Sequence, residues 1–148
     1  MTRHDDINSI NNATAFIILR TARLLRFHLN KVLEDAELGI SAEQWFILFK
    51  LWETPDVPQN ALADPVLNDE PNITRLLNAL EAQGLITRTV DTQDKRRKLI
   101  SLSSKGHAMM EDFLPEVADI RKQVFTGIAD NEIEQLVDML NRVENNII

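Results

Sequence analysis

The apolar pattern of this chain changes, in its middle third, from the period of a helix to that of strands. Between residues 70 and 84 apolar side chains recur three and four positions apart, which is typical of a helix with one buried face. Gly84 ends that helix, because glycine accepts the left-handed conformation of a C-cap. Residues 85–90 and 98–102 then alternate or favour strands on either side of a charged stretch. We therefore expect a helix followed at once by a two-stranded hairpin. The apolar helix positions are Ile73, Leu76, Leu77 and Leu80.

Two helices are expected before this segment. Residues 10–35 carry apolar side chains three and four apart and predict a long amphipathic helix. Ser41 and Gln44 have the spacing of a capping box, in which each residue bonds the backbone of the other, and they open a second helix over 42–53. A stripe of aromatic residues on this second helix is most simply explained as core.

The chain between the second helix and residue 70 is expected to be mostly irregular. Pro55 and Pro58 break the helical pattern. A short third helix is expected over 59–67, where Pro65 limits it to a turn or two. Residues 68–71, with the sequence Asn-Asp-Glu-Pro, supply cap residues and an early proline for the helix that follows.

Two further amphipathic helices are expected after the hairpin. Ser103 or Ser104 caps the first of them, and Pro115 is expected to kink it. The second follows Gly127 and continues to the end of the chain. Apolar residues in the first of these helices repeat alternately three and four apart, as in a seam between packed helices.

The charge of the chain is distributed unevenly. Its net charge of −7 argues, taken alone, against a nucleic-acid partner. Residues 85–106, however, hold six basic and two acidic side chains, a local charge of +4 that leaves −11 for the remainder. This asymmetry fits a protein that presents one basic face to a polyanion and stays soluble through an acidic body. The basic residues are Arg88, Lys95, Arg96, Arg97, Lys98 and Lys105.

Several classes of function lack the residues they need. The chain has no cysteine, so it forms no disulfide or thiolate metal site. Its three histidines are scattered without the spacing of paired metal ligands, and no nucleophile motif or phosphate-binding glycine loop is present, so we expect neither a metal site nor an enzyme. The amino-terminal stretch lacks the layout of a signal peptide, and a cytoplasmic location without membrane insertion is expected.

The central segment resembles the MarR family of transcriptional regulators. Residues 71–88, PNITRLLNALEAQGLITR, look like its recognition helix passing into the first wing strand. The stretch 91–97, DTQDKRR, is similar to the wing, where an Asp-x-Arg pair precedes a strand ending in Leu-Thr-x-x-Gly. Leu62 and Ala63 lie where the family carries Leu-Ala in the first helix-turn-helix segment. The matching positions after the wing are Leu99, Leu102, Ser103, Ser104 and Gly106, with Ser103 replacing the usual threonine.

The resemblance implies a mainly α (α+β) fold, a winged helix-turn-helix with long N- and C-terminal dimerisation helices and a two-stranded β wing. It implies a single domain over 1–148, with dimerisation helices at about 10–35 and 104–148 and a DNA-binding lobe at about 41–103. The implied function is sequence-specific binding of double-stranded DNA by a homodimer on a pseudo-palindromic operator, as a repressor without a cofactor.

The expected recognition helix offers polar side chains on its outer side. Arg75 has the geometry to pair bidentately with guanine, and Asn72 or Asn78 with adenine. Thr74 shares this outer side, and Pro71 stands in the first turn. An ordinary solvated helix face would have the same composition, so the wing decides between the two interpretations.

The expected wing carries four adjacent cations that repel one another and add little stability. A phosphate or minor-groove partner would give them a use, although a charge run by itself is more often a solvated loop. The resemblance implies that Arg96 enters the minor groove and that Asp94 holds it by a short-range pair. The cations are Lys95, Arg96, Arg97 and Lys98.

Two further partners are expected. Apolar stripes on the first and the last two helices exceed what so small a hairpin covers, which indicates a homodimer. The resemblance also implies an aromatic or lipophilic effector whose binding lowers DNA affinity. Its candidate pocket consists of Phe16, Arg20, Phe27, Trp45 and Phe49. The alternative function is a winged-helix protein-interaction module whose basic wing docks on an acidic partner, without specific DNA binding.

Overall fold

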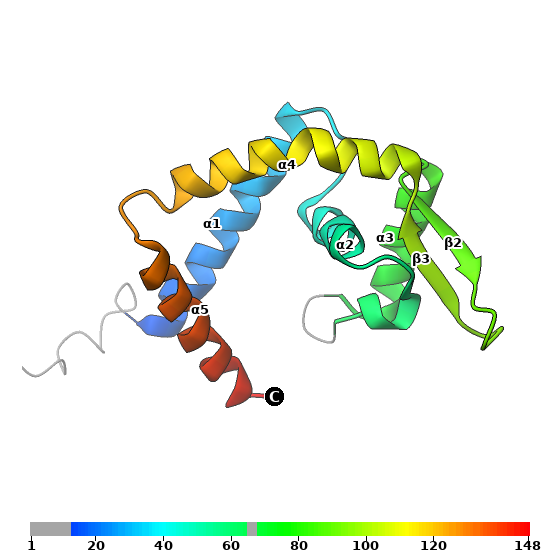
Figure 1. Ribbon diagram of the computed structural model, residues 1–148. Helices are drawn as coiled ribbons and strands as arrows, with labels where there is room; N and C mark the ends of the chain where they lie inside the picture. The colour runs from blue at the N-terminus through cyan, green and yellow to red at the C-terminus, as the bar shows by residue number, and fades with distance from the viewer. Residues whose placement is uncertain (1–12, 65–67) are drawn as a thin grey trace, which may run out of the picture. The chain divides into compact units, whose positions relative to one another are not determined.

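The computed structural model describes residues 13–64 and 68–148 of the chain (Figure 1). The chain divides into two compact units, Met1–His107 and Ala108–Ile148. The expectation that Pro65 limits a third helix, and the first three residues of the helix expected over 10–35, lie outside the described residues. We describe each unit separately.

The first unit begins with the two expected helices, α1 (Thr14–Asp35) and α2 (Ala42–Glu53). The capping box is present, since the Ser41 hydroxyl accepts a hydrogen bond from the Gln44 amide at 3.3 Å and the Gln44 carboxamide accepts one from the Ser41 amide at 2.9 Å. The side chain of Asn30 accepts a further bond from the first amide of α2 at 2.8 Å. These contacts satisfy amides that the start of a helix leaves without partners, so they fix where α2 begins.

The sheet of the first unit has three antiparallel strands in the order β1-β3-β2. The expected hairpin is present as β2 (Ile86–Val90) and β3 (Lys98–Leu102), side by side in Figure 1. A short strand that the sequence analysis did not predict, β1 (Val57–Pro58), pairs Val57 with Ile100 on the other side of β3. The strand β3 is therefore hydrogen-bonded to a neighbouring strand on each side.

The helix expected over 59–67 is shorter than predicted. It is a single 3-10 turn, η2 (Gln59–Leu62), and Ala63 is already extended. Beyond it the backbones of Asp64 and Asn68 exchange two hydrogen bonds, of 2.8 and 2.9 Å. This bridge brings the chain back to the start of α3 (Glu70–Ala82), the helix expected from the central apolar repeat.

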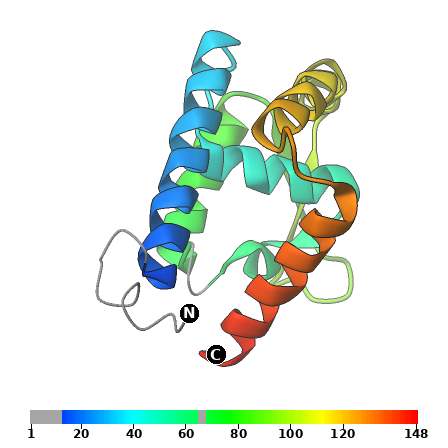
Figure 2. The same cartoon turned by 90° about the vertical axis from the view of Figure 1, so that its left-hand side faces the viewer.

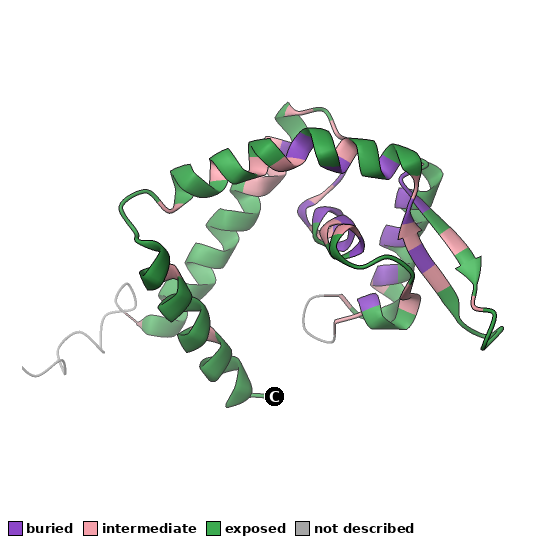
Figure 3. Ribbon diagram, viewed as in Figure 1, coloured by how far each residue is buried: buried purple, intermediate pink, exposed green. Residues whose placement is uncertain are grey.

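The core of the first unit forms around α2. This helix contacts α1, α3 and β3, and Figure 2 shows it running across α1. Buried residues gather on α2, α3 and the sheet, whereas α1 is largely exposed (Figure 3). Trp45 is buried and stacks at a tilt against Phe49, with ring centroids 6.2 Å apart, so the aromatic stripe contributes to the core as expected. Other core residues include Leu48, Leu51, Ile73, Leu77, Leu80, Leu85 and Ile100.

The junction between the sheet and the next helix is closely packed. The Ser103 hydroxyl accepts a hydrogen bond from the Gly106 amide at 3.0 Å and donates one to the Gly84 carbonyl at 2.5 Å. Of the two serines expected to cap this helix, Ser103 makes the capping contact. A Cβ atom on Gly106 would lie only 2.1 Å from the carbonyl oxygen of Leu85. The close approach of two backbones therefore requires glycine at 106.

The last two helices were also expected. They are α4 (Ser104–Val124), which starts in the first unit and runs into the second with Pro115 inside it, and α5 (Asp130–Asn145). Met110 and Phe113 of α4 are buried. No residue of α5 is buried, although it is strongly amphipathic. Its exposed apolar residues include Leu136, Val137, Met139 and Val143.

Candidate nucleic-acid interface

The helix α3 separates its apolar and polar residues as expected. Asp69 caps it by accepting a hydrogen bond from the Asn72 amide at 3.0 Å, and Pro71 stands in the first turn, where its missing N–H costs nothing. The apolar repeat faces the core, while Thr74, Arg75 and Asn78 are exposed. The polar side chains therefore present a continuous outer face that begins at the amino end of the helix.

Polar contacts tie the first turns of this face together. The Asn72 amide nitrogen donates to the Asn68 side-chain oxygen at 2.5 Å, and the Asn72 oxygen accepts from the Arg75 guanidinium at 2.5 Å. The Thr74 hydroxyl donates to the Glu70 carbonyl at 3.0 Å and accepts from the Gln59 amide at 3.3 Å. The early side chains of the helix are thus held by neighbours before any ligand arrives.

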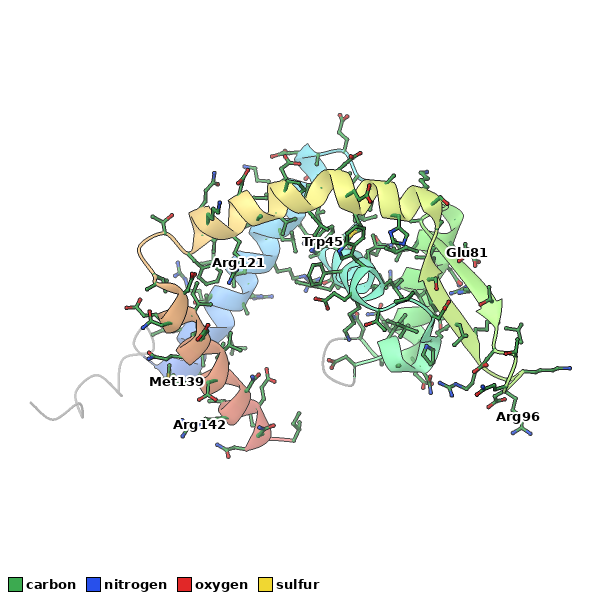
Figure 4. All side chains as sticks on the ribbon, in the orientation of Figure 1. Trp45, Glu81, Arg96, Arg121, Met139 and Arg142 are labelled. Carbon is green, nitrogen blue, oxygen red and sulfur yellow. The ribbon has the colours of Figure 1, made fainter. Side chains whose placement is uncertain are left out.

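A strand residue holds the later part of the face. Arg88 of β2 donates through Nη1 to the Asn78 side-chain oxygen at 2.8 Å and reaches Glu81 at 3.4 Å (Glu81 is labelled in Figure 4). Its side chain is only 14% exposed, and among the residues that the structure describes its buried Nε and Nη2 groups find no hydrogen-bond partner. Arg88 therefore joins the wing to α3.

The wing tip is shaped by its own backbone. Hydrogen bonds from Asp91 N to Arg97 O at 3.0 Å and from Arg97 N to Asp94 O at 2.9 Å close the loop. The Asp94 carboxylate accepts from the Arg96 backbone amide at 3.0 Å. The expected short-range pair thus involves the Arg96 backbone, and in the described part of the chain no ion pair joins the two side chains. This contact leaves the Arg96 guanidinium free to extend from the tip, as Figure 4 shows.

One hollow brings the helix face and the wing together. It has a volume of about 400 Å³ and lies between η2, the amino end of α3 and the tip of the wing. Thr74 borders it from the helix, while Arg96, Arg97 and Lys98 border it from the wing. Positive side chains and helix donors on one concave surface suit a phosphate-bearing polymer. The remaining lining residues are Gln59, Asn60, Ala63, Glu70 and Ile73.

Sequence reasoning did not assign roles to several residues of this surface. Asn68 was expected only as a cap residue, and Arg88 only as one basic side chain among six. Their contacts with Asn72 and Asn78 join residues four and ten positions apart. The spacing of Asn68 and Asn72 is one helical turn, but Asn68 precedes the helix, so no periodic pattern reveals the contact. Gln59 likewise meets Thr74 only because η2 folds against α3.

The candidate effector pocket is only partly assembled in the first unit. A cavity of about 810 Å³ along α1 is lined by Phe16, Arg20 and Phe27, three of the five expected residues. Trp45 and Phe49 do not line it, since Trp45 is buried in the core of the unit. The other lining residues are Leu19, Arg23, Leu24, Arg26 and Asn30.

The charged residues of this cavity differ in their pairing. Arg26 forms an ion pair with Glu43 of α2. Arg20 and Arg23 have no acidic partner within residues 13–64 and 68–148. Over the same residues no helix is both long and apolar enough to cross a membrane, and no group of three or more acidic or histidine side chains is arranged to hold a metal ion.

Comparison with known proteins identifies the winged-helix part. Residues 40–98 match the model of the MarR family, which covers α2 through the start of β3 and includes both polar surfaces described above. This part of the chain is similar to the MarR family. The resemblance inferred from the recognition helix and wing is thereby confirmed, as is the mainly α fold with a β wing.

The similarity to solved structures covers nearly the whole chain. A probable transcriptional regulator from Pseudomonas aeruginosa is 29% identical, with a TM-score of 0.79 over 91% of this chain and 99% of that one. A MarR-family transcriptional regulator from Rhodococcus sp. RHA1 is 26% identical, with a TM-score of 0.80 over 92% and 95% of the two chains. CouR from Rhodococcus jostii RHA1, solved with bound p-coumaroyl-CoA, is 25% identical, with a TM-score of 0.80 over 92% and 94%. The chain thus has the fold of a MarR-family transcriptional regulator.

Proposed function

We propose that this protein is a transcriptional repressor that binds a specific double-stranded DNA sequence as a homodimer. The observation that carries the proposal is the hollow shared by η2, α3 and the wing, where Gln59 and Thr74 face the same space as three cations of the wing. We propose that the protein acts without enzymatic activity and without a cofactor, because such a regulator needs only a DNA-binding surface and a ligand that changes its affinity for DNA. We propose a cytoplasmic location, which is where a regulator of this kind would meet genomic DNA in a cell without a nucleus.

The helix α3 is the element proposed to enter the major groove. Its outer face carries Arg75, whose guanidinium matches the two acceptors on the edge of guanine. Pro71 and Thr74 lie at the amino end, where backbone amides and the helix dipole favour a nearby phosphate. Asn72 and Asn78 complete the proposed contact surface on the same helix.

The wing is proposed to hold the DNA backbone and the minor groove. Its cations are exposed or half-exposed and concentrate the positive charge of an otherwise acidic chain. Asp94 fixes the turn through the Arg96 amide, so the Arg96 guanidinium can reach outward. Cations in this position contribute affinity that is independent of sequence and depends on salt. The proposed wing contacts are Asp94, Lys95, Arg96, Arg97 and Lys98.

A second copy of the chain is proposed to cover the apolar helices at the two ends of the chain. Exposed apolar residues lie along α1, where Leu19 is 67% and Phe27 69% exposed, and along all of α5. Apolar surface of this extent is unusual on a monomer. A symmetric dimer would present two copies of α3 to half-sites about one helical turn apart, roughly 10 base pairs, which is why we propose a pseudo-palindromic operator.

A small aromatic or lipophilic molecule is proposed to release the protein from DNA. The cavity along α1 supports this, because it combines the rings of Phe16 and Phe27 with the unpaired Arg20. CouR, with the same fold, binds p-coumaroyl-CoA. Trp45 and Phe49 were expected to line the pocket. Their rings contact each other on α2, and in this proposal they support the packing of that helix and do not contact the ligand. A ligand that favours one spacing of the two recognition helices would change DNA affinity by linkage.

Selection of genomic DNA tests the proposal. Purified protein is incubated at moderate salt with fragments of its own genome, bound DNA is sequenced, and the selection is repeated with Arg96→Ala. Arg121→Ala, which removes the same charge from α4, is the matched control. We expect wild type and the control to enrich an inverted repeat that Arg96→Ala fails to enrich, and we expect a reporter driven from an enriched promoter to rise when the protein is absent.

The opposite result would favour a different use of the same fold. If no fragment is enriched and duplex DNA binds no better than a random sequence, the basic wing serves an acidic protein partner, a role that the acidic remainder of the chain also permits. If the reporter falls in the absence of the protein, the chain is an activator and the DNA-binding part of the proposal stands.

A further inference from the structure

Three polar side chains at the start of α3 form a hydrogen-bonded relay. Asn72 donates from Nδ2 to the Asn68 oxygen and accepts at Oδ1 from the Arg75 guanidinium, both at 2.5 Å. Asn68 lies before the helix, while Asn72 and Arg75 are one turn apart on it. The relay therefore runs from the loop that precedes α3 to the arginine best placed to contact a base.

The relay uses part of the hydrogen-bonding capacity of Asn72 and fixes the orientation of its side-chain amide. One of its two N–H groups and one of the two lone pairs on its oxygen are bonded in the structure. Bidentate recognition of adenine needs the asparagine oxygen and amide nitrogen at the same time, so Asn72 could meet adenine only with the remaining N–H and lone pair, in the orientation that Asn68 and Arg75 impose, or by breaking the relay. Arg75 has five N–H donors and spends one on Asn72, which leaves four for the two acceptors of guanine.

The loop end of the relay is fixed by the backbone. Asn68 exchanges two backbone hydrogen bonds with Asp64, and the Asp69 side chain caps the Asn72 amide at 3.0 Å. Asn72 is therefore held at its backbone and at both atoms of its side-chain amide. An arginine anchored to such a residue has fewer rotamers to lose on binding, so its contact with a base is strengthened without any new contact to DNA.

We propose that Asn72 is a positioning residue that orients Arg75 through the Asn68–Asn72–Arg75 relay, and that Arg75 alone reads a base, a guanine, at this point of the operator. This inference rests on the proposed DNA-binding function and assigns specificity within it. It differs from the expectation drawn from the sequence, in which Asn72 or Asn78 pairs with an adenine.

Asn78 supplies a matched control. It has the same side chain on the same helix, it is exposed, and its oxygen accepts from Arg88 at 2.8 Å and not from Arg75. Replacing it removes an asparagine from the proposed DNA-facing surface and leaves the relay intact.

The test is a base-by-base measurement of specificity. Wild-type protein first selects its operator from a random duplex library. Binding to all single-base variants of that operator is then measured for Arg75→Ala, Asn72→Ala, the double variant and Asn78→Ala. Thermal unfolding confirms that each variant folds. Asn68→Ala and Asn72→Asp complete the set. Asn68→Ala removes the end of the relay that is not proposed to contact DNA. Asn72→Asp keeps an acceptor for Arg75, and an acidic residue is favourable in the first turn of a helix.

We expect Arg75→Ala to lower the preference for one guanine about 5- to 100-fold. Asn72→Ala should lower the preference at the same base pair by about 3- to 10-fold, which corresponds to the net contribution of one ordinary, solvent-exposed hydrogen bond. The double variant should match Arg75→Ala alone, because the two residues act as a unit. Asn68→Ala should weaken that same preference, whereas Asn72→Asp should retain it despite weaker overall binding, and Asn78→Ala should leave it unchanged.

Two results would overturn the inference, and they are distinguishable. If Asn72→Ala erases a preference at a separate A·T pair, keeps the guanine preference and combines additively with Arg75→Ala, then Asn72 reads a base directly and the relay has no role in specificity. If the wild-type protein selects no sequence at all, the proposed function itself fails, and this inference fails with it.

Discussion

Replacing Gly106 with alanine should destabilise the protein even though it improves helix propensity. Gly106 lies in the first turn of α4, where alanine is normally favoured over glycine by about 1 kcal/mol. Its Cβ would stand 2.1 Å from the Leu85 carbonyl oxygen, about 1 Å closer than a carbon and an oxygen approach in proteins. Leu85 cannot move freely, since its side chain is buried and its carbonyl accepts from the Ser103 amide at 3.0 Å.

The size of the effect follows from these opposing contributions. Overpacking that displaces backbone costs about 1–3 kcal/mol and sometimes more. With the loss of the Ser103–Leu85 contact added and the gain in helix propensity subtracted, we expect a net loss of about 2 kcal/mol. For a chain of this length that corresponds to a fall in melting temperature of roughly 4–8 °C.

Thermal unfolding by circular dichroism, at one fixed protein concentration, measures this change. Gly127→Ala is the control, because Gly127 has a φ of +83° and no atom within 4 Å of the Cβ that would be added. It should lose only the cost of a left-handed alanine, about 1 kcal/mol. A Gly106→Ala protein that melts at or above the wild-type temperature would show that α4 does not begin against the carbonyl of Leu85, and the reasoning would be refuted.

Three other predictions concern the core, the wing and the helix ends. Leu77→Ala should lower the free energy of unfolding in urea by about 2–5 kcal/mol, because Leu77 is fully buried, and a loss below 1 kcal/mol would contradict its place in the core. Arg97→Ala should reduce the slope of log affinity for DNA against log salt by about one, and an unchanged slope would exclude a phosphate contact. Val137→Asp should convert the proposed dimer into a monomer in sedimentation experiments, since it places a charge on the exposed apolar face of α5, and a dimer that persists would locate the interface elsewhere.

The helices could be predicted closely because their signals are local. The start of α2 could be predicted from the capping box formed by Ser41 and Gln44, which are three positions apart, and α3 could be predicted from the apolar repeat that ends at Gly84. The hairpin followed from two short strand patterns around a charged tip. In each case neighbouring residues carry both the pattern and the contact that produces the structure.

The strand β1 was missed because nothing local favours it. Val57 stands between Pro55 and Pro58, and the pairing of β1 with β3 depends on residues more than forty positions away. The same holds for the site. The outer face of α3 could be predicted from periodicity, but the bonds of Arg88 to Asn78 and of Gln59 to Thr74 arise only when separate elements meet. The pocket expectation named Trp45 and Phe49, whose helical stripe looks the same whether it faces a ligand or, as for Trp45, the core.

The pairing of β1 with β3 has a consequence for folding. The pairing of Val57 with Ile100 closes a loop of the chain. This loop contains all of α3, all of β2 and the tip of the wing, which are the elements that meet at the candidate interface. Such a long-range contact costs chain entropy that is recovered only when the enclosed elements have packed. The helix α3 and the wing should therefore order and disorder in one cooperative step, and hydrogen exchange in α3 should match that in β3 when the first unit opens.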